Sequence, residues 1–151
     1  MSADSKAYML RQRMRFNALR YEGVAELGQG EKGAIIGYLT RALGGNDARH
    51  IVLAWLFTGE AWHPLSTKNL TNGQWQVIKE WIGAYNDEEG WHTQPNFEVE
   101  AAVLLNAALL SIVKFGAEEF LEEPLYSVAV AMREYQAEIS TITMGKEGVE
   151  Q

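Results

Sequence analysis

Apolar residues along this chain recur at helical spacing. The clearest case is the segment 31–43, in which the apolar side chains fall on one side of a helix: Ile35, Ile36, Leu39 and Leu43. No run of six residues alternates cleanly between apolar and polar. A period near 3.6 residues is typical of helices with one buried face, whereas strict alternation is typical of half-buried strands. The pattern therefore predicts an all-α fold.

Glycine residues punctuate this pattern and separate six predicted helices. Gly28 ends the first helix, and Gly44 supplies a left-handed stop for the second. Asn46 or Asp47 is expected to cap the third helix. Residues 83–95 interrupt the pattern for longer and are expected to be irregular. The predicted helices span residues 5–27, 31–43, 48–57, 71–82, 97–115 and 125–142.

The start of the fourth helix is the most specific local signal. Thr71 and Gln74 match the capping box, in which each side chain accepts a hydrogen bond from the backbone N–H of the other residue. Leu70 and Trp75 are spaced for the hydrophobic staple that accompanies this box. The sequence therefore specifies where this helix begins and that Trp75 faces a core.

The segment 97–115 is apolar almost all round, which indicates a helix at the centre of the fold. At 151 residues the chain is long enough to bury a core without disulfides or a structural metal. We therefore expect one compact bundle of five or six helices over residues 1–144, followed by a frayed tail over residues 145–151.

Composition excludes several classes of protein. The chain has no cysteine, so disulfides, thiolate nucleophiles and cysteine-ligated metal centres are excluded. The N-terminal residues lack the charged and then apolar layout of a signal peptide, and the longest apolar run, residues 101–113, is too short to span a bilayer. These features predict a cytoplasmic protein that does not enter a membrane.

Charge is divided unevenly along the chain. Residues 1–50 hold eight Lys and Arg against five Asp and Glu, a balance of +3, whereas residues 51–151 hold five against fifteen, a balance of −10. Such asymmetry is typical of proteins that contact nucleic acid, and also of acidic and basic surfaces that meet within a fold or between copies.

Basic side chains gather on the first predicted helix. Lys6, Arg13 and Arg20 lie seven residues apart and share one stripe, while Arg11 and Arg15 lie on a neighbouring face. We expect the arginines of this surface to bind a protein partner or a second copy of the chain. An ordinary solvated face is the alternative that involves no partner.

Nucleic acid is a further alternative for the same helix. Arginines there could contact phosphates, and Tyr8 and Phe16 could stack on bases. The net charge of −7 opposes general binding to nucleic acid, because the acidic remainder of the chain repels phosphate.

Five tryptophans fall within 37 consecutive residues. Three of them lie on apolar helical faces and are expected in the core, whereas Trp62 and Trp91 lie in predicted loops beside histidine. Tryptophan is enriched at interface hot spots, so these two residues are candidate partner anchors. The alternative is that each indole pins its loop onto the core.

The three histidines have no spacing typical of a metal site. His50, His63 and His92, with Glu60 or Glu89, have ligand types that suit zinc or iron, but none forms the two-histidine helical motif of metalloproteases. The chain also lacks a phosphate-binding glycine loop, a calcium loop and a nucleophile constellation. We therefore expect no cofactor and no enzymatic activity, with a His/Glu metal-dependent enzyme as the second alternative.

The segment 46–82 resembles a known helical module. Its start, Asp47-Ala48-Arg49, is followed by Ser66-Thr67-Lys68-Asn69-Leu70-Thr71 and then by an amphipathic helix. This layout is similar to the small helical module of Mu-like phage regulatory proteins of the GemA type, and to tails of some phage recombination proteins. The resemblance implies two linked helices and a setting in DNA replication, recombination or transcription control. Residues 60–65 depart from the pattern as an insertion, and the resemblance assigns no functional residue.

Together these features predict a helical interaction module that binds a macromolecular partner or itself. Phage or mobile-element origin is what the resemblance implies. The first alternative is an accessory DNA- or RNA-binding protein that uses the basic first helix. The candidate partner-binding residues are Arg11, Arg13, Arg15, Arg20, Trp62 and Trp91.

Overall fold

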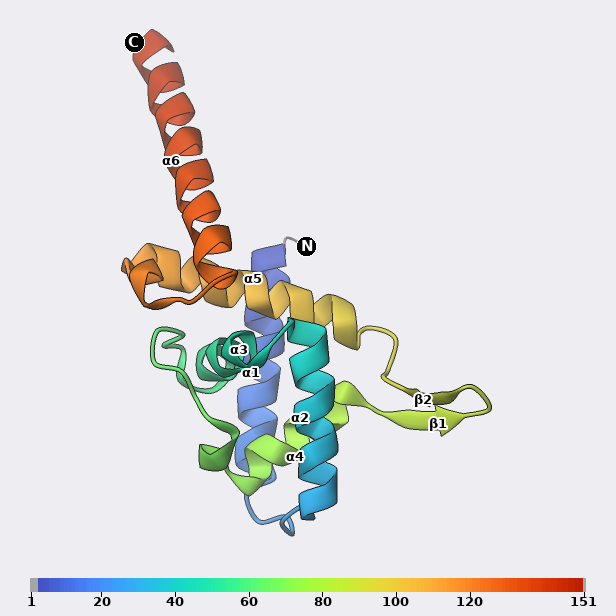
Figure 1. Ribbon diagram of the computed structural model, residues 1–151. Coiled ribbons are helices and arrows are strands. Elements are labelled where there is room, and N and C mark those ends of the chain that lie inside the picture. The colour runs from blue at the N-terminus through green and yellow to red at the C-terminus, as the bar shows by residue number, and fades with distance from the viewer. Residues whose placement is uncertain (1–2, 151) are drawn as a thin grey trace. The chain divides into compact units, whose positions relative to one another are not determined.

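The computed structural model describes the backbone of residues 3–150 and the side chains of residues 5–141. Within that part the chain is mostly helical, which confirms the predicted all-α class (Figure 1). The helices are α1 (Ala3–Arg20), α2 (Gln29–Leu43), α3 (Asn46–Thr58), α4 (Asn72–Ile82), α5 (Phe97–Phe115) and α6 (Leu125–Glu150), with 3-10 turns at Thr67–Asn69 and Glu118–Phe120. Two short strands, β1 (Tyr85–Asp87) and β2 (Gly90–His92), lie between α4 and α5.

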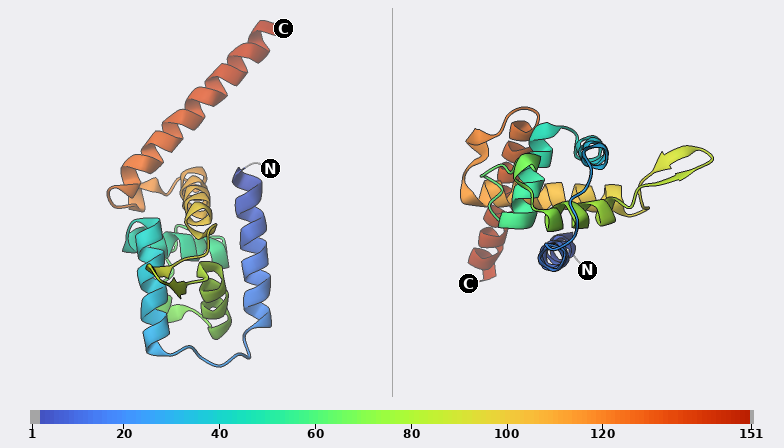
Figure 2. Two further views of the ribbon diagram at one scale, coloured as in Figure 1. Left: turned by 90° about the vertical axis from the view of Figure 1, so that its right-hand side faces the viewer. Right: turned by 90° about the horizontal axis from the view of Figure 1, so that it is seen from below.

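The chain forms two compact units, Met1–Ala108 and Leu109–Gln151. In the first unit, α1 and α2 lie on either side of α3 and α4 and contact both of them (Figure 2). Helix α3 is the most enclosed, because every side chain from Ala48 to Phe57 except that of His50 is buried. The core of this unit therefore centres on α3, and α1 presents its opposite face outward.

Helix α1 approaches α4 at a glycine. Ala7, Leu10, Met14 and Ala18 form the buried face of α1. A Cβ atom on Gly73 would lie only 1.9 Å from the carbonyl oxygen of Ala18. The two backbones therefore approach so closely that only glycine fits at position 73. This close approach fixes how α1 is held and hence which of its faces is exposed.

The predicted start of α4 is confirmed. The Thr71 hydroxyl accepts a hydrogen bond from the Gln74 N–H at 3.1 Å, and the Gln74 side chain accepts from the Thr71 N–H at 2.9 Å. Gly83 ends the helix in the left-handed conformation with φ of 57°. The predicted inward residues of α4 are all buried: Trp75, Ile78, Trp81 and Ile82.

The segment expected to be irregular contains a β-hairpin instead. Strands β1 and β2 pair antiparallel, with Tyr85 opposite His92 and Asn86 opposite Trp91. Figure 1 shows the hairpin extending away from the helices of its unit. Three-residue strands carry too few positions for alternation to appear in the sequence, which explains why the prediction missed them.

Several helix boundaries differ from the prediction. Helix α1 ends at Arg20, seven residues before the expected end, and Val24 is exposed rather than buried. Helix α3 has Gly45 at its N-cap with no side-chain cap, so Asn46 and Asp47 lie inside the first turn. Helix α6 continues to Glu150, past the expected end at residue 142; the tail expected over residues 145–151 lies outside the described side chains.

Helix α5 has the predicted bounds. Its first part buries one stripe, which contains Phe97, Ala101, Leu104 and Ala108, while Val99 on another side is exposed. In the second unit, α6 is tied down near its start: the guanidinium of Arg133 pairs with Glu118 and donates a hydrogen bond to the Val113 carbonyl at 3.0 Å. Among the described helices, none is long and apolar enough to cross a membrane.

Candidate partner-binding surfaces

The outward face of α1 carries four large apolar side chains in water. Tyr8, Met9, Phe16 and Leu19 are between 56% and 69% exposed. At 100° per residue, Met9 and Phe16 lie nearly in line, with Leu19 and Tyr8 on one side of them. Tyr8 also makes an edge-to-face contact with Trp55, at a centroid distance of 5.7 Å. We call these four residues the α1 stripe.

Cations border the α1 stripe on both edges. By the same helical geometry Lys6, Arg13 and Arg20 follow one edge, and Arg15 lies on the other. The Arg20 guanidinium lies 5.9 Å from the centroid of the Phe16 ring. None of the four cations forms an ion pair with a described residue. Their charge is therefore not neutralised by an ion pair with any described residue.

Arg11 has a different role from the other arginines of α1. Its Nε donates a hydrogen bond to the Trp55 carbonyl at 2.7 Å, and its guanidinium lies 5.3 Å from the Trp55 ring centroid. The side chain also packs against Gly59, where an added Cβ would lie 2.5 Å from Nη2. Partial burial, with the nearby charge of Arg15, lowers the pKa of Arg11. Arg11 thus holds α1 against α3, a role hidden from sequence analysis because its partner is 44 residues away.

The two loop tryptophans differ in exposure. Trp62 is half-buried, with its ring 6.3 Å from that of His63. Trp91 lies on β2 and is 66% exposed. Only Trp91 therefore presents most of its indole to solvent, which the predicted role as a partner anchor requires.

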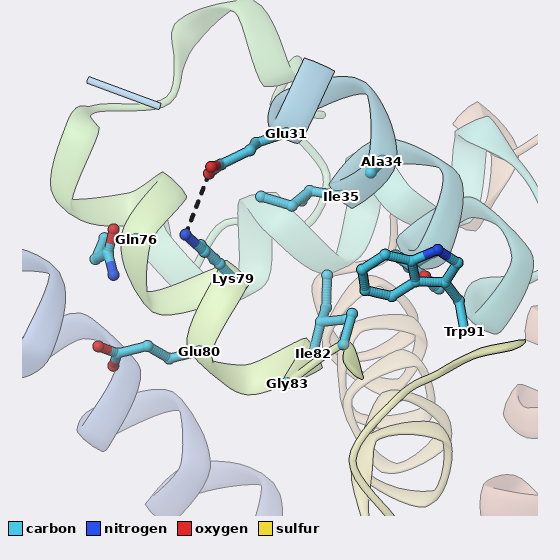
Figure 3. Close-up of a pocket in the computed structure, with 11 residues that line it drawn as sticks. Glu31, Ala34, Ile35, Gln76, Lys79, Glu80, Ile82, Gly83 and Trp91 are labelled. Carbon is cyan, nitrogen blue, oxygen red and sulfur yellow. Dashed lines mark hydrogen bonds and ion pairs between the residues drawn. The ribbon is translucent and has the colours of Figure 1, made fainter. Parts of the chain in front are cut away.

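Trp91 also borders an apolar groove of about 660 Å³ between α2 and α4. Figure 3 shows its indole near Ile82, while the ion pair between Glu31 and Lys79 at 3.2 Å lies toward the other end. Ala34 and Ile35 of α2 form the opposite wall. Indole and groove together make a second accessible apolar surface in the first unit.

The other side of the hairpin is polar. His92 Nε2 lies 2.7 Å from the Asp87 carboxylate, and the His92 ring lies 5.4 Å from that of Tyr85. A hydrogen bond from the Glu89 N–H, and then the contact with His92, lower the pKa of Asp87. These contacts brace the short hairpin from which Trp91 projects.

A buried arginine links α2 to α3. Arg49 donates hydrogen bonds to the Thr40 hydroxyl at 2.6 Å and to the side-chain Oδ1 of Asn46 at 3.0 Å, and its Nε has no hydrogen-bond partner among the described residues. Its Nη2 lies 3.2 Å from His50 Nε2, which must accept, because a guanidinium can only donate. Burial lowers the pKa of Arg49; burial, and then the charge of Arg49, lower the pKa of His50.

The histidines are not brought together as a metal site. Among the described residues, no group of three or more His, Asp or Glu side chains could hold an ion. His50 contacts Arg49 and His92 contacts Asp87, so each lies in a separate local network.

Comparison with known proteins adds no relative: no protein-family model, curated protein sequence or solved structure matches this chain.

Proposed function

We propose that this protein is a helical interaction module that binds an acidic amphipathic helix of a partner protein through the outward face of α1. The observation that carries the proposal is the α1 stripe, whose four exposed apolar side chains are bordered by four cations without a described carboxylate partner. Exposed apolar surface rimmed by polar groups is typical of interaction sites. At 100° per residue the exposed Gln12 lies between the two ends of the stripe, so its apolar surface forms two patches, Tyr8 with Met9 and Phe16 with Leu19.

The shape of this surface suits a helix. From Met9 to Leu19 the stripe is about 15 Å long at 1.5 Å per residue, close to three turns of a partner helix. An amphipathic helix presents apolar anchors at i, i+3 or i+4, and i+7, which matches the extent of the stripe. Because α1 is already helical and is held against α3 and α4, this protein does not have to fold a new helix when the partner binds.

The charge of this surface selects an acidic partner. Glutamates beside the partner's apolar anchors would meet Arg13 and Arg20 on one edge and Arg15 on the other. Tyr8 and Phe16 could stack on bases, but nucleic acid suits the chain less well because its net charge of −7 repels phosphate.

The direct test is a fluorescence-anisotropy titration of the full chain with a synthetic acidic amphipathic peptide that carries leucine anchors and flanking glutamates. A scrambled peptide of the same composition, a DNA duplex and anionic lipid vesicles are the competing probes. We expect the acidic amphipathic peptide to bind best, and to bind more weakly as salt rises. Equal binding of the scrambled peptide, or preference for DNA or vesicles, would contradict the proposal.

Two pairs of variants locate the contact. Phe16→Ser should weaken binding by roughly 30-fold if Phe16 is an interface anchor worth about 2 kcal/mol, whereas Phe120→Ser removes an exposed phenylalanine from another element and should not. Arg13→Glu should weaken binding roughly tenfold, whereas Lys68→Glu, the same charge change on an exposed turn, should not. Loss of binding in both members of either pair would place the contact elsewhere.

A further inference from the structure

Helix α6 carries a heptad pattern. Taking Leu125 as position a, the next positions d, a, d and a are Val128, Met132, Tyr135 and Ile139, with alternating steps of three and four residues. The sequence continues this spacing with isoleucine at position 142, beyond the described side chains. A repeat of 3.5 residues is typical of helices that pair along one seam.

Most of this seam is exposed to solvent. Val128, Tyr135 and Ile139 are between 46% and 64% exposed, and every side chain from residue 133 to residue 141 is exposed. Among the described side chains of α6, those that hold the helix lie near its beginning: Leu125 and Ala129 are buried, and Arg133 contacts Glu118 and the Val113 carbonyl.

A helix of this kind needs a partner to persist in water. Helical stability in proteins comes mainly from packing of the apolar face rather than from intrinsic propensity. Glu134, Ala137 and Glu138 favour helix, so a partner would stabilise the uncovered apolar face of α6 rather than compensate for weak helix propensity. Burial of the seam against a second helix would provide the apolar packing that stabilises this part of α6.

We infer that α6 pairs in parallel with α6 of a second copy of this chain. In a parallel two-stranded coiled coil each a and d residue meets its own counterpart, so the apolar seam is complementary to itself. The flanking e and g positions offer no like-charge clash: Ala129, Ala131 and Gln136 are uncharged, and the e position that would face Glu138 is a threonine in the sequence. This inference concerns a different surface from the α1 stripe and does not rest on the proposed function.

The seam is short, and its length limits the expected affinity of the dimer. Leu125 is buried within its own unit, so the described part that is free to pair, Val128 to Ile139, spans about 17 Å. We therefore expect a reversible dimer whose population depends on concentration rather than a permanent one. Dimerisation would also present two copies of each binding surface to a multivalent partner.

The first test is sedimentation equilibrium of the full chain over a range of micromolar concentrations. The apparent mass should rise from 16.9 kDa toward twice that value. Tyr135→Glu should abolish this rise, whereas Ala137→Glu, which adds the same charge on the opposite side of the helix, should leave it unchanged. A strict monomer at every concentration, or equal effects of the two variants, would overturn the inference.

The second test exploits the absence of native cysteine. With a mild oxidant, the full chain carrying Tyr135→Cys should form a disulfide dimer quickly, because parallel pairing places the two new thiols face to face. Ala137→Cys is the matched control and should cross-link far more slowly. Equal rates would indicate random collision, and a dimer by sedimentation without a cross-link at position 135 would overturn parallel pairing.

Discussion

At the residue scale, Gly73 is where the fold tolerates least change. An added methyl group would collide with the Ala18 carbonyl, and backbone atoms on both sides must move to make room. We predict that Gly73→Ala lowers the free energy of unfolding by at least about 2 kcal/mol, in the upper range for overpacking a core. Urea denaturation followed by circular dichroism measures this change.

Gly37 is the matched control for this substitution. It lies inside α2, is exposed, and has no neighbouring atom within 4 Å of an added Cβ. Gly37→Ala should therefore raise the free energy of unfolding by about 0.5–1 kcal/mol, the usual gain in helix propensity. A loss of stability at Gly37, or none at Gly73, would contradict this description of the α1–α4 contact.

A second residue-scale prediction concerns His50 and pH. Burial and the charge of Arg49 hold the pKa of His50 below its ordinary value of 6.5, so the unfolded chain binds the proton more readily than the folded chain. The stability linked to His50 is therefore complete above pH 6.5 and falls as pH decreases through the lower pKa of the folded state. Protonation would also remove the acceptor that faces Arg49 Nη2.

Urea denaturation between pH 7 and pH 5 tests this prediction. His50→Gln should flatten the decline in the free energy of unfolding, because glutamine retains an acceptor that does not titrate in this range. His63→Gln makes the same exchange at an exposed position and is the matched control. The same flattening in both variants would contradict the assignment to His50.

Residue patterns in the sequence predict burial better than they predict partners. Leu10, Met14 and the apolar face of α4 follow from helical periodicity and are buried. The role of Arg11 does not follow, because the carbonyl that it contacts lies on another helix. Burial of Arg49 was also missed, since a charged side chain beside a predicted helix start is expected at the surface.

At the element scale, the tryptophan on the β-hairpin, Trp91, differs in burial from Trp81 at the end of α4. Trp91 is mostly exposed, whereas Trp81 is buried and stacks edge-to-face on Phe97 at 4.7 Å. We predict that Trp91→Ala changes the free energy of unfolding by less than about 0.5 kcal/mol, and that Trp81→Ala lowers it by about 3–5 kcal/mol. Thermal and urea denaturation of the two variants provide the comparison.

A large loss of stability in Trp91→Ala would mean that the indole pins the hairpin to the helices. That result would contradict the description of Trp91 as an accessible surface residue. It would also favour the alternative given in the sequence analysis, in which each loop tryptophan packs against the core and holds its loop in place.

The bounds of a helix could be predicted where a clear local signal in the sequence marks its start or its extent. The bounds of α5 and the start of α4 match the sequence prediction, because an apolar run and a capping box specify them directly. The end of α1 does not match: the sequence remains compatible with helix after Arg20, yet the chain turns there. Short strands leave no periodic signal, and so the hairpin appeared only in the structure.

At the scale of the whole molecule, two of the three exposed apolar surfaces suggest two kinds of association. The α1 stripe has cations on both edges and is proposed to bind an acidic helix, whereas the α6 seam is nearly uncharged at its edges and is inferred to pair with itself. Salt should therefore weaken the first association and affect the second little, because screening acts on the charges that border the stripe.

The proposed recognition of an acidic amphipathic helix by α1 depends on paired charges and apolar contact, and exchanging those charges between the two partners tests it. Arg13→Glu with Arg20→Glu should weaken binding of the acidic peptide by more than roughly tenfold. A peptide in which arginine replaces the flanking glutamates should then bind this variant to within about threefold of the original affinity, because the opposite charges face each other again. If the arginine peptide binds the variant no better than the acidic peptide does, the proposed recognition by α1 is wrong.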